Sequence, residues 1–393
     1  MEFILRYLAV ALAAVLVFGA AKYMDNTPVN LEKETKQEAT VRQETETVTE
    51  AEKETAARTE PKATKPVETK PAATEPAATE PAETEPQERR YVLTFAGDCT
   101  FGGLEKYITA GYGFNKTVGT DYGYPFRNVQ EYFRTDDFTM VNLEGVLGDQ
   151  GQKSGKRYDF RGKEAYVNIL TQNYVEAVTL ANNHTMDYGS EGYARTKEIL
   201  EEKEILYVEA NDSLLVTLEG GLKIAIYGTV YNNIDELETI ENIKALKEAG
   251  ADLVIYAPHW GVENTFRPNQ QQTNLAHAVI DAGADIIYGS HPHVLQPVEE
   301  YGDGVIFYSL GNFSFGGNMY PKDYDTAFIQ QEVIRAADGT VTLGERTLIP
   351  CRISSIDNRN DFQPTPYKEG SADFKRTMDK LNGTYKGKNL AVD

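Results

Sequence analysis

The chain has 393 residues and a net charge of −21 at pH 7. Nucleic-acid binding needs a basic surface to face the phosphates, so this charge argues against a nucleic-acid partner. Cys99 and Cys351 are the only cysteines, which excludes a fold built on a disulfide framework and leaves open whether the two form one bridge or remain thiols.

An apolar segment near the start of the sequence, residues 3–21, is interrupted only by Arg6. Its length is close to the ~20 residues that a bilayer-spanning helix needs. Arg6 before the apolar run, with little positive charge after it, favours a cytoplasmic amino terminus. We therefore expect residues 1–22 to be a single-pass anchor in the cell membrane, with the rest of the chain extracellular. Gly19 and Ala21 also suit signal peptidase, so a cleaved signal peptide is the alternative.

The next segment, residues 23–90, is rich in Glu, Thr, Ala, Lys and Pro and contains the repeat AATEP-AATEP-AETEP. Such a composition cannot bury enough apolar surface to order a backbone, so we expect a disordered linker. Its regularly spaced prolines and its carboxylates favour an extended stalk between membrane and domain. Low-complexity sequence without a function is the alternative.

After Arg90, short β-branched and aromatic runs alternate with amphipathic helical stretches, which is typical of an α/β domain. We expect this domain to cover residues 91–360. A C-terminal tail would follow at residues 361–393, with a short amphipathic helix near 372–381. The predicted strands are 91–96, 138–141, 177–180, 253–257, 285–288 and 305–308, and the predicted helices are 192–203, 237–249 and 268–282.

A second, partly antiparallel sheet is indicated by four further runs. A hairpin of residues 214–218 and 223–229 surrounds Gly220-Gly221, and two more strands are expected at 328–335 and 340–349. Two packed mixed β-sheets flanked by helices would accommodate all of these elements. The expected fold is therefore a four-layer α-β-β-α arrangement.

Polar side chains follow six of the predicted strands. The carboxyl ends of strands line one crevice in sheets of this kind, so these side chains should converge. Imidazoles and carboxylates hold divalent transition metals, and the His291-x-His293 spacing after a strand can point both rings into one cavity. His277 lies in a helical pattern instead and serves as an internal control. The strand-end residues are Asp98, Glu144, Asn183, His184, His259, His291 and His293.

A basic loop at residues 153–163 is a candidate substrate-binding patch in an otherwise acidic domain. An anionic substrate would need such a patch, and Lys156, Arg157 and Arg161 are the residues we assign to it. A solvated, flexible loop is the alternative reading. Trp260, next to His259, is a further candidate for the pocket wall, with a buried core position as its alternative.

Six ordered motifs resemble the bacterial capsule-synthesis CapA family of poly-γ-glutamate biosynthesis proteins, whose fold is similar to that of calcineurin-like metallophosphoesterases. The resemblance covers roughly residues 91–360. The motifs are GD at 97–98, NLEG at 142–145, ANNHxxDYG at 181–189, HWGxE at 259–263, GSHPHVLQP at 289–297 and YSLGNF at 308–313.

This resemblance implies a site for one or two divalent ions, with manganese, zinc, iron and magnesium all open as identities. Glu144 would stand where phosphoesterases have a metal-bridging carboxylate, and Asn183 would bind through its amide oxygen. The implied metal ligands are Asp98, Glu144, Asn183, His259, His291 and His293.

The implied catalytic residues are His184, as proton donor or oxyanion stabiliser, and Asp187, as the group that orients it. One departure concerns the first strand, where phosphoesterases carry Asp-x-His and this chain has Asp98 followed by Thr100. Capsule proteins more often have an arginine several residues on, where Gly103 stands. A mononuclear site, or one filled only with substrate bound, is therefore open.

The expected function is that of a membrane-anchored, extracytoplasmic CapA-like protein in capsule or poly-γ-glutamate synthesis, export or anchoring, with a metal-dependent hydrolase or transferase site. Its expected partners are poly-γ-glutamate or another anionic surface polymer, the membrane subunits of the polymer synthetase, and the membrane itself. The alternative is a non-catalytic polymer-binding or scaffold subunit of the synthetase complex.

Overall fold

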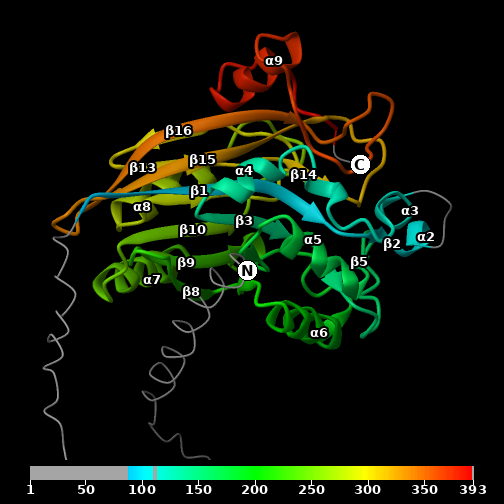
Figure 1. Ribbon diagram of the computed structural model, residues 1–393, viewed down its shortest axis with the longest axis horizontal. Coiled ribbons are helices and arrows are strands. Elements are labelled where there is room, and N and C mark those ends of the chain that lie inside the picture. Colours follow the sequence, from blue (N-terminus) through cyan, green and yellow to red (C-terminus); the bar gives the residue numbers. More distant parts are fainter. Residues whose placement is uncertain (1–86, 109–112, 392–393) are drawn as a thin grey trace, which may run out of the picture. The chain divides into compact units, whose positions relative to one another are not determined.

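The computed structural model describes residues 87–108 and 113–391. The first of its two large sheets has the strand order β17-β16-β15-β1-β3-β6-β7, with β14 beside β1 (Figure 1). Strands β1, β3, β6 and β7 are parallel, and β15 to β17 are antiparallel. The bounds are β1 Arg89–Thr100, β3 Phe138–Leu143, β6 Ala177–Thr179, β7 Leu206–Val208, β14 Asn312–Phe315, β15 Asp325–Arg335, β16 Val341–Arg352 and β17 Thr365–Pro366.

The second sheet has the order β12-β13-β11-β10-β9-β8. Its four central strands are parallel, and β8 and β12 pair antiparallel at the edges. The bounds are β8 Asp212–Thr217, β9 Lys223–Val230, β10 Leu253–His259, β11 Ile286–Tyr288, β12 Val298–Tyr301 and β13 Gly304–Phe307.

A small third sheet of β2 (Gly103–Leu104), β5 (Phe160–Gly162) and β4 (Val146–Leu147) lies beyond the end of β1. Its strands are two or three residues long. It holds the segment after β3 against the basic loop, since β5 pairs with both β2 and β4.

Three apolar cores separate four layers. Alternate residues such as Leu93 and Phe95 of β1 meet Ile255 of β10 between the two sheets, which fits the period of two of a strand. The outer face of the first sheet is covered by α3 Phe114–Val118, α4 Gln130–Thr135, α5 Val167–Gln172 and α6 Gly189–Glu202, and that of the second by α7 Glu236–Glu248 and α8 Gln270–Asp281.

Helix α8 shows why these segments fold as helices. Asn269 caps its first turn, and a capping box joins it to Gln272. Leu275, Ala276 and Val279 then fall on one buried face that packs against the second sheet. The short elements that complete the chain are α2 Glu105–Ile108, η1 Tyr124–Phe126, η2 Glu164–Tyr166, η3 Tyr231–Asn233 and α9 Ala372–Leu381.

The predicted fold class, two packed mixed sheets flanked by helices, is confirmed, but the expected composition of the second sheet was wrong. The hairpin β8–β9 does belong to it, because β9 pairs with β10 over seven residues. The pair β15–β16 belongs to the first sheet, because β15 runs antiparallel to β1 from Arg89 to Ala96. An alternating pattern shows that a strand has a buried face and does not show which sheet it joins.

The described residues beyond 360, which the sequence analysis assigned to a tail, pack on the domain. Phe362 is fully buried in the helix-side core of the first sheet. β17 pairs with β16, and α9 lies against β15 and β16, with Lys380 bonded to Asp323 and Asp325.

The expected anchor at residues 1–22 and the linker at 23–90, apart from its last four residues, lie outside the described residues. Within 87–108 and 113–391, none of the helices is both long and apolar enough to cross a bilayer.

Candidate metal centre

Strand ends from both large sheets bring the polar motifs together. Asp98 lies near the end of β1, and Asn142 lies opposite it in β3. His259 ends β10 in the second sheet and is bridged to Ser290, which follows β11. Since these strands are parallel within each sheet, their carboxyl ends open at one edge, as the sequence pattern predicts.

The first ligand group consists of Asp98, Glu144 and His293. The Nδ1 atom of His293 is 3.3 Å from Oδ2 of Asp98, and its Nε2 atom is 3.7 Å from Oε1 of Glu144. Both carboxylates are fully buried. Among the described residues, Oδ2 of Asp98 and Oε1 of Glu144 are buried oxygens without a hydrogen-bond partner. A buried charge is costly unless it is paired or bound to a cation, so this pair suits a metal ion.

The second group gathers around His259. Its Nε2 atom is 2.7 Å from Oδ1 of Asn183 and 3.1 Å from Nδ1 of His291. Its Nδ1 atom hydrogen bonds with Oγ of Ser290 at 2.8 Å, which fixes the orientation of the ring. Glu263 lies within ligand distance of His291 and His293. Asn183, His259 and His291 therefore lie together, and Glu263 reaches this set through His291.

The turn that carries His291 and His293 has an unusual backbone. Their φ angles are 98° and 58°, in the region that residues other than glycine rarely adopt. Strand β11 ends at Tyr288, so strand alternation, on which the sequence argument relied, does not aim these rings. The left-handed turn aims them instead, and strain of this kind persists where surrounding contacts hold it in place.

Burial and neighbouring charges separate the histidines by pKa. Burial lowers the pKa of His291 to about 3, with His293 and His184 adding to the effect, and it lowers the pKa of His259 well below its ordinary value. Both rings are therefore neutral, as a metal ligand must be. Burial also acts to lower the pKa of His293, but the charges of Glu144 and Asp98 outweigh burial and raise this pKa to about 10. Burial raises the pKa of Glu144 to about 7.

His184 and Asp187 form a dyad beside the first group. The Nδ1–H group of His184 donates to Oδ2 of Asp187 at 2.7 Å, and its Nε2 atom lies 3.6 Å from Oε1 of Glu144. Phe160 packs on the His184 ring and donates its backbone N–H to Asp187. Lys156 reaches the same Asp187 through Nζ, at 3.1 Å. The dyad can hold a proton on the Nε2 side, toward the ligand group.

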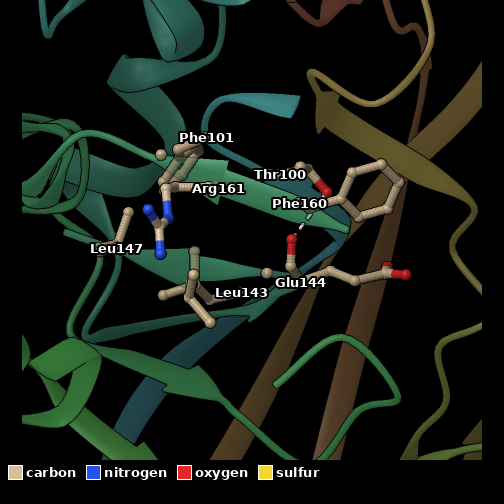
Figure 2. A pocket seen from close by; sticks show the side chains of 10 residues that line it. Thr100, Phe101, Leu143, Glu144, Leu147, Phe160 and Arg161 are labelled. Atoms are coloured by element: carbon tan, nitrogen blue, oxygen red, sulfur yellow. Dashed lines mark hydrogen bonds between the residues drawn. The ribbon is translucent and has the colours of Figure 1, made fainter. Parts of the chain in front are cut away.

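The other three substrate-binding predictions lie elsewhere. Arg161 donates to the backbone carbonyls of residues 149–151 and stacks on Tyr188, so its donors hold a loop. In Figure 2 its guanidinium points to the side opposite the Glu144 carboxylate. Arg157 stacks on Tyr158 at the surface. Trp260 is buried between the second sheet and its helices and donates to the carbonyl of Tyr308, which fits the alternative of a buried core position.

Thr100 occupies the place of the missing phosphoesterase histidine. Its Oγ1 donates to the backbone carbonyl of Glu144 at 2.9 Å, a bond that Figure 2 shows beside Phe160. Thr100 thus fixes the backbone of a candidate ligand, and its hydroxyl is not directed as a ligand. Both cysteines are free and buried, which settles the open question of a bridge, and burial raises the pKa of Cys99.

Sequence reasoning missed Glu263 and the residues that orient the ligands. Glu263 stands in the HWGxE motif, so its spacing from His259 was the available signal. Asn142 donates to Oδ1 of Asp98 at 2.8 Å, and Oδ1 of Asn312 is 2.9 Å from Nδ1 of His293. Both asparagines stand inside quoted motifs. His277, the control, pairs with Glu299 at a distance from the cluster in sequence and in structure.

Residues 92–317 match the family described as bacterial capsule synthesis protein PGA_cap. The chain belongs to this family. It is 33% identical over 272 residues to the capsule biosynthesis protein CapA of Bacillus anthracis, covering 62% of this chain and 64% of that protein. It is 30% identical over 296 residues to the PGA biosynthesis protein CapA of Bacillus subtilis, covering 68% of this chain and 75% of that protein.

Two solved structures are also similar at low identity. The NAD nucleotidase NadN of Haemophilus influenzae matches at 13% identity with a TM-score of 0.39, over 75% of this chain and 56% of that one. A 5′-nucleotidase precursor from Thermus thermophilus matches at 13% identity with a TM-score of 0.41, over 70% and 56%. The fold class given above rests on the strand order of the two sheets and not on these two matches.

Proposed function

We propose that this PGA_cap protein acts in capsule or poly-γ-glutamate synthesis, export or anchoring through a metal-dependent hydrolase or transferase site. The observation that carries the proposal is the pair of buried, unpartnered carboxylate oxygens on Asp98 and Glu144, which face His293. The donor set fits a divalent transition metal, because it combines carboxylate oxygens with imidazole nitrogens. A structural role alone does not account for two buried carboxylates that each keep one oxygen without a hydrogen-bond donor.

In this proposal Asp98, Glu144 and His293 would hold one ion, and a second would bind at His291 and Glu263, next to His259 and Asn183. A bound divalent ion polarises an ester or amide oxygen and makes a water nucleophile available at neutral pH. The other residues act on the substrate directly. His184, oriented by Asp187, gives a proton from Nε2 to the leaving group. Lys156, with its side chain 45% exposed, binds a substrate carboxylate beside the dyad.

The location of the reaction follows from the amino-terminal sequence. We propose that residues 1–22 anchor the chain in the cell membrane and that the acidic, proline-rich linker at 23–90 carries the domain on its outer side. The apolar run at residues 3–21 supports the anchor, and the repeat at 72–86 supports the linker. The anionic polymer would then meet the domain outside the cytoplasm.

The test is to purify the full chain, load it with manganese, zinc or iron, and measure bound metal by elemental analysis. Phosphodiesters and poly-γ-glutamate are then assayed for cleavage or chain transfer. We expect bound metal, and loss of both metal and activity in Asp98→Asn and Glu144→Gln. His277→Gln is the control, because His277 lies outside the cluster and should change neither. A chain that takes up no ion under any loading would overturn the proposal.

A second candidate is a polymer-binding or scaffold subunit that performs no reaction. Thr100 favours it, because the first strand lacks the histidine that completes the phosphoesterase pattern. A scaffold would bind poly-γ-glutamate or the synthetase subunits equally well in wild type and in Asp98→Asn. If Asp98→Asn loses polymer turnover but still co-purifies with the synthetase subunits, the catalytic role is separate from the scaffold role.

A further inference from the structure

We propose that the C-terminal strap, residues 383–391, is a positioning element that holds Glu263 in the second ligand group. This inference rests on the proposed function, since it concerns the binding of the second ion. The strap is far from the histidines in sequence and contains none of the candidate ligands. It acts through the loop at residues 263–267.

The strap contacts this loop along its length. Oδ1 of Asn389 accepts from the backbone N–H of Phe266 at 3.0 Å, and the N–H of Leu390 donates to the carbonyl of Asn264 at 3.0 Å. Tyr385 packs edge-on against the Phe266 ring, and its carbonyl accepts from Arg267 at 2.9 Å. The two hydrogen bonds from residues 389 and 390 reach Phe266 and Asn264, inside the loop that begins at Glu263.

The same loop contacts the histidine turn directly. The N–H of Asn264 donates to the carbonyl of Pro292 at 2.8 Å, between His291 and His293. Asn264 has a φ of 62°, which turns the chain at this point. Glu263 lies close enough to His291 and His293 to share a metal ion with them. The loop therefore joins the strap on one side to two candidate ligands on the other.

The base of the strap is fixed by α9. Lys380, which is 2% exposed, lies 4.7 Å from the centre of the Phe266 ring and pairs with Asp323 and Asp325. The helix thus anchors the strap to β15, and the strap spans from there to the 263–267 loop. Loss of the strap contacts should free Glu263 without disturbing Asp98 or Glu144, which belong to the first sheet and the segment after β3.

The experiment compares three changes in the full chain: Asn389→Ala, Asn389→Asp and Lys388→Ala. Cobalt or manganese binding is titrated, with calorimetry for stoichiometry and the visible spectrum of cobalt for ligand geometry. Asn389→Ala should weaken one of two bound ions by about tenfold, as for other residues that orient a ligand. Asn389→Asp keeps the acceptor for Phe266 and should restore binding. Lys388→Ala, at the neighbouring exposed position, is the matched control.

Glu263→Gln identifies the ion concerned, because it should weaken the same one. The double variant Glu263→Gln with Asn389→Ala should then be no weaker than Glu263→Gln alone, since the strap acts through Glu263. Unchanged binding of two ions in Asn389→Ala would overturn the inference and leave the proposed function intact. Equal weakening of both ions would also overturn it. A wild-type chain without metal would overturn the proposed function, and this inference with it.

Discussion

At the scale of single residues, the site is defined by buried carboxylates that each keep one oxygen outside the hydrogen-bond network. These oxygens of Asp98 and Glu144 lie near His293, whereas their second oxygens face Asn142. His184 differs, because its Nδ1 partner is fixed and its Nε2 atom faces the cluster. This division separates residues suited to hold an ion from the residue suited to move a proton.

Asp187→Asn tests that division. The variant replaces the carboxylate with a neutral amide, which no longer stabilises a positive charge on His184 and can donate to Nδ1, so that the ring takes the other tautomer. We expect polymer or phosphodiester turnover to fall by about 100-fold or more, the scale of general acid catalysis, with metal content unchanged. Steady-state kinetics and elemental analysis check the two parts. Met186→Leu is the control at an exposed position of the same turn. Full activity in Asp187→Asn would remove the dyad from the mechanism.

At the scale of elements, α9 is held by charge and carries the strap. Nε and Nη2 of Arg376 both donate to the buried Asp325, at 2.8 and 2.6 Å. Burial alone would raise the pKa of Asp325. Arg376 and Lys380 outweigh burial and lower this pKa below the ordinary value of 3.8. The bond stabilises the folded state as long as Asp325 is ionised.

Arg376→Met should therefore have a pH-dependent effect on stability. Because the folded-state pKa of Asp325 is lowered, the contribution is fully present above pH 3.8 and is lost as the pH falls through the folded-state pKa. At pH 7 we expect the free energy of unfolding to fall by about 1–2 kcal/mol, since Arg376 is partly exposed. Denaturant unfolding from pH 7 to pH 3 measures it, with Lys375→Met as the control on the exposed face. A difference from wild type that stays constant down to pH 3 would contradict the assignment.

At the scale of the whole molecule, the candidate metal centre is built from residues of both large sheets. Asp98 belongs to the first sheet and His259 to the second, whereas His291 and His293 follow β11. An ion that binds the folded chain alone stabilises it by mass action. The folded domain, in which both sheets contribute potential ligands, should therefore be more stable when an ion is bound.

Removal of metal should lower the melting temperature. At an ion concentration about 100 times the dissociation constant, the stabilisation is about 2.7 kcal/mol, which corresponds to several degrees for a domain of this size. Calorimetry of the full chain with manganese, and again after a chelator, measures the difference. Asp98→Asn with Glu144→Gln is the comparison, because it removes two ligands of the first group and should show a smaller shift than wild type. An equal shift in that variant would place the stabilising ion elsewhere.

Much of the element order follows from local sequence. The strands at 138–143 and 253–259 have long apolar runs, and α8 has a cap followed by apolar residues on one face. The three-stranded sheet could not be predicted in this way, because strands of two or three residues carry no period. Among the site residues, the histidines were found from their place after strands. Glu263 was not, because it lies in the loop four residues beyond the end of β10 and does not directly follow a strand.

The sequence by itself determined the α/β class, the family motifs and the convergence of polar strand ends. The apolar period that indicates strands and helices is visible within short segments, and the carboxyl ends of parallel strands meet at one edge by a general rule. Tertiary structure alone decided which sheet β15 and β16 join, that Lys156 reaches the dyad while Arg161 holds a loop, and that Glu263 faces His291. Each of these depends on contacts between segments far apart in the chain, which no local pattern records.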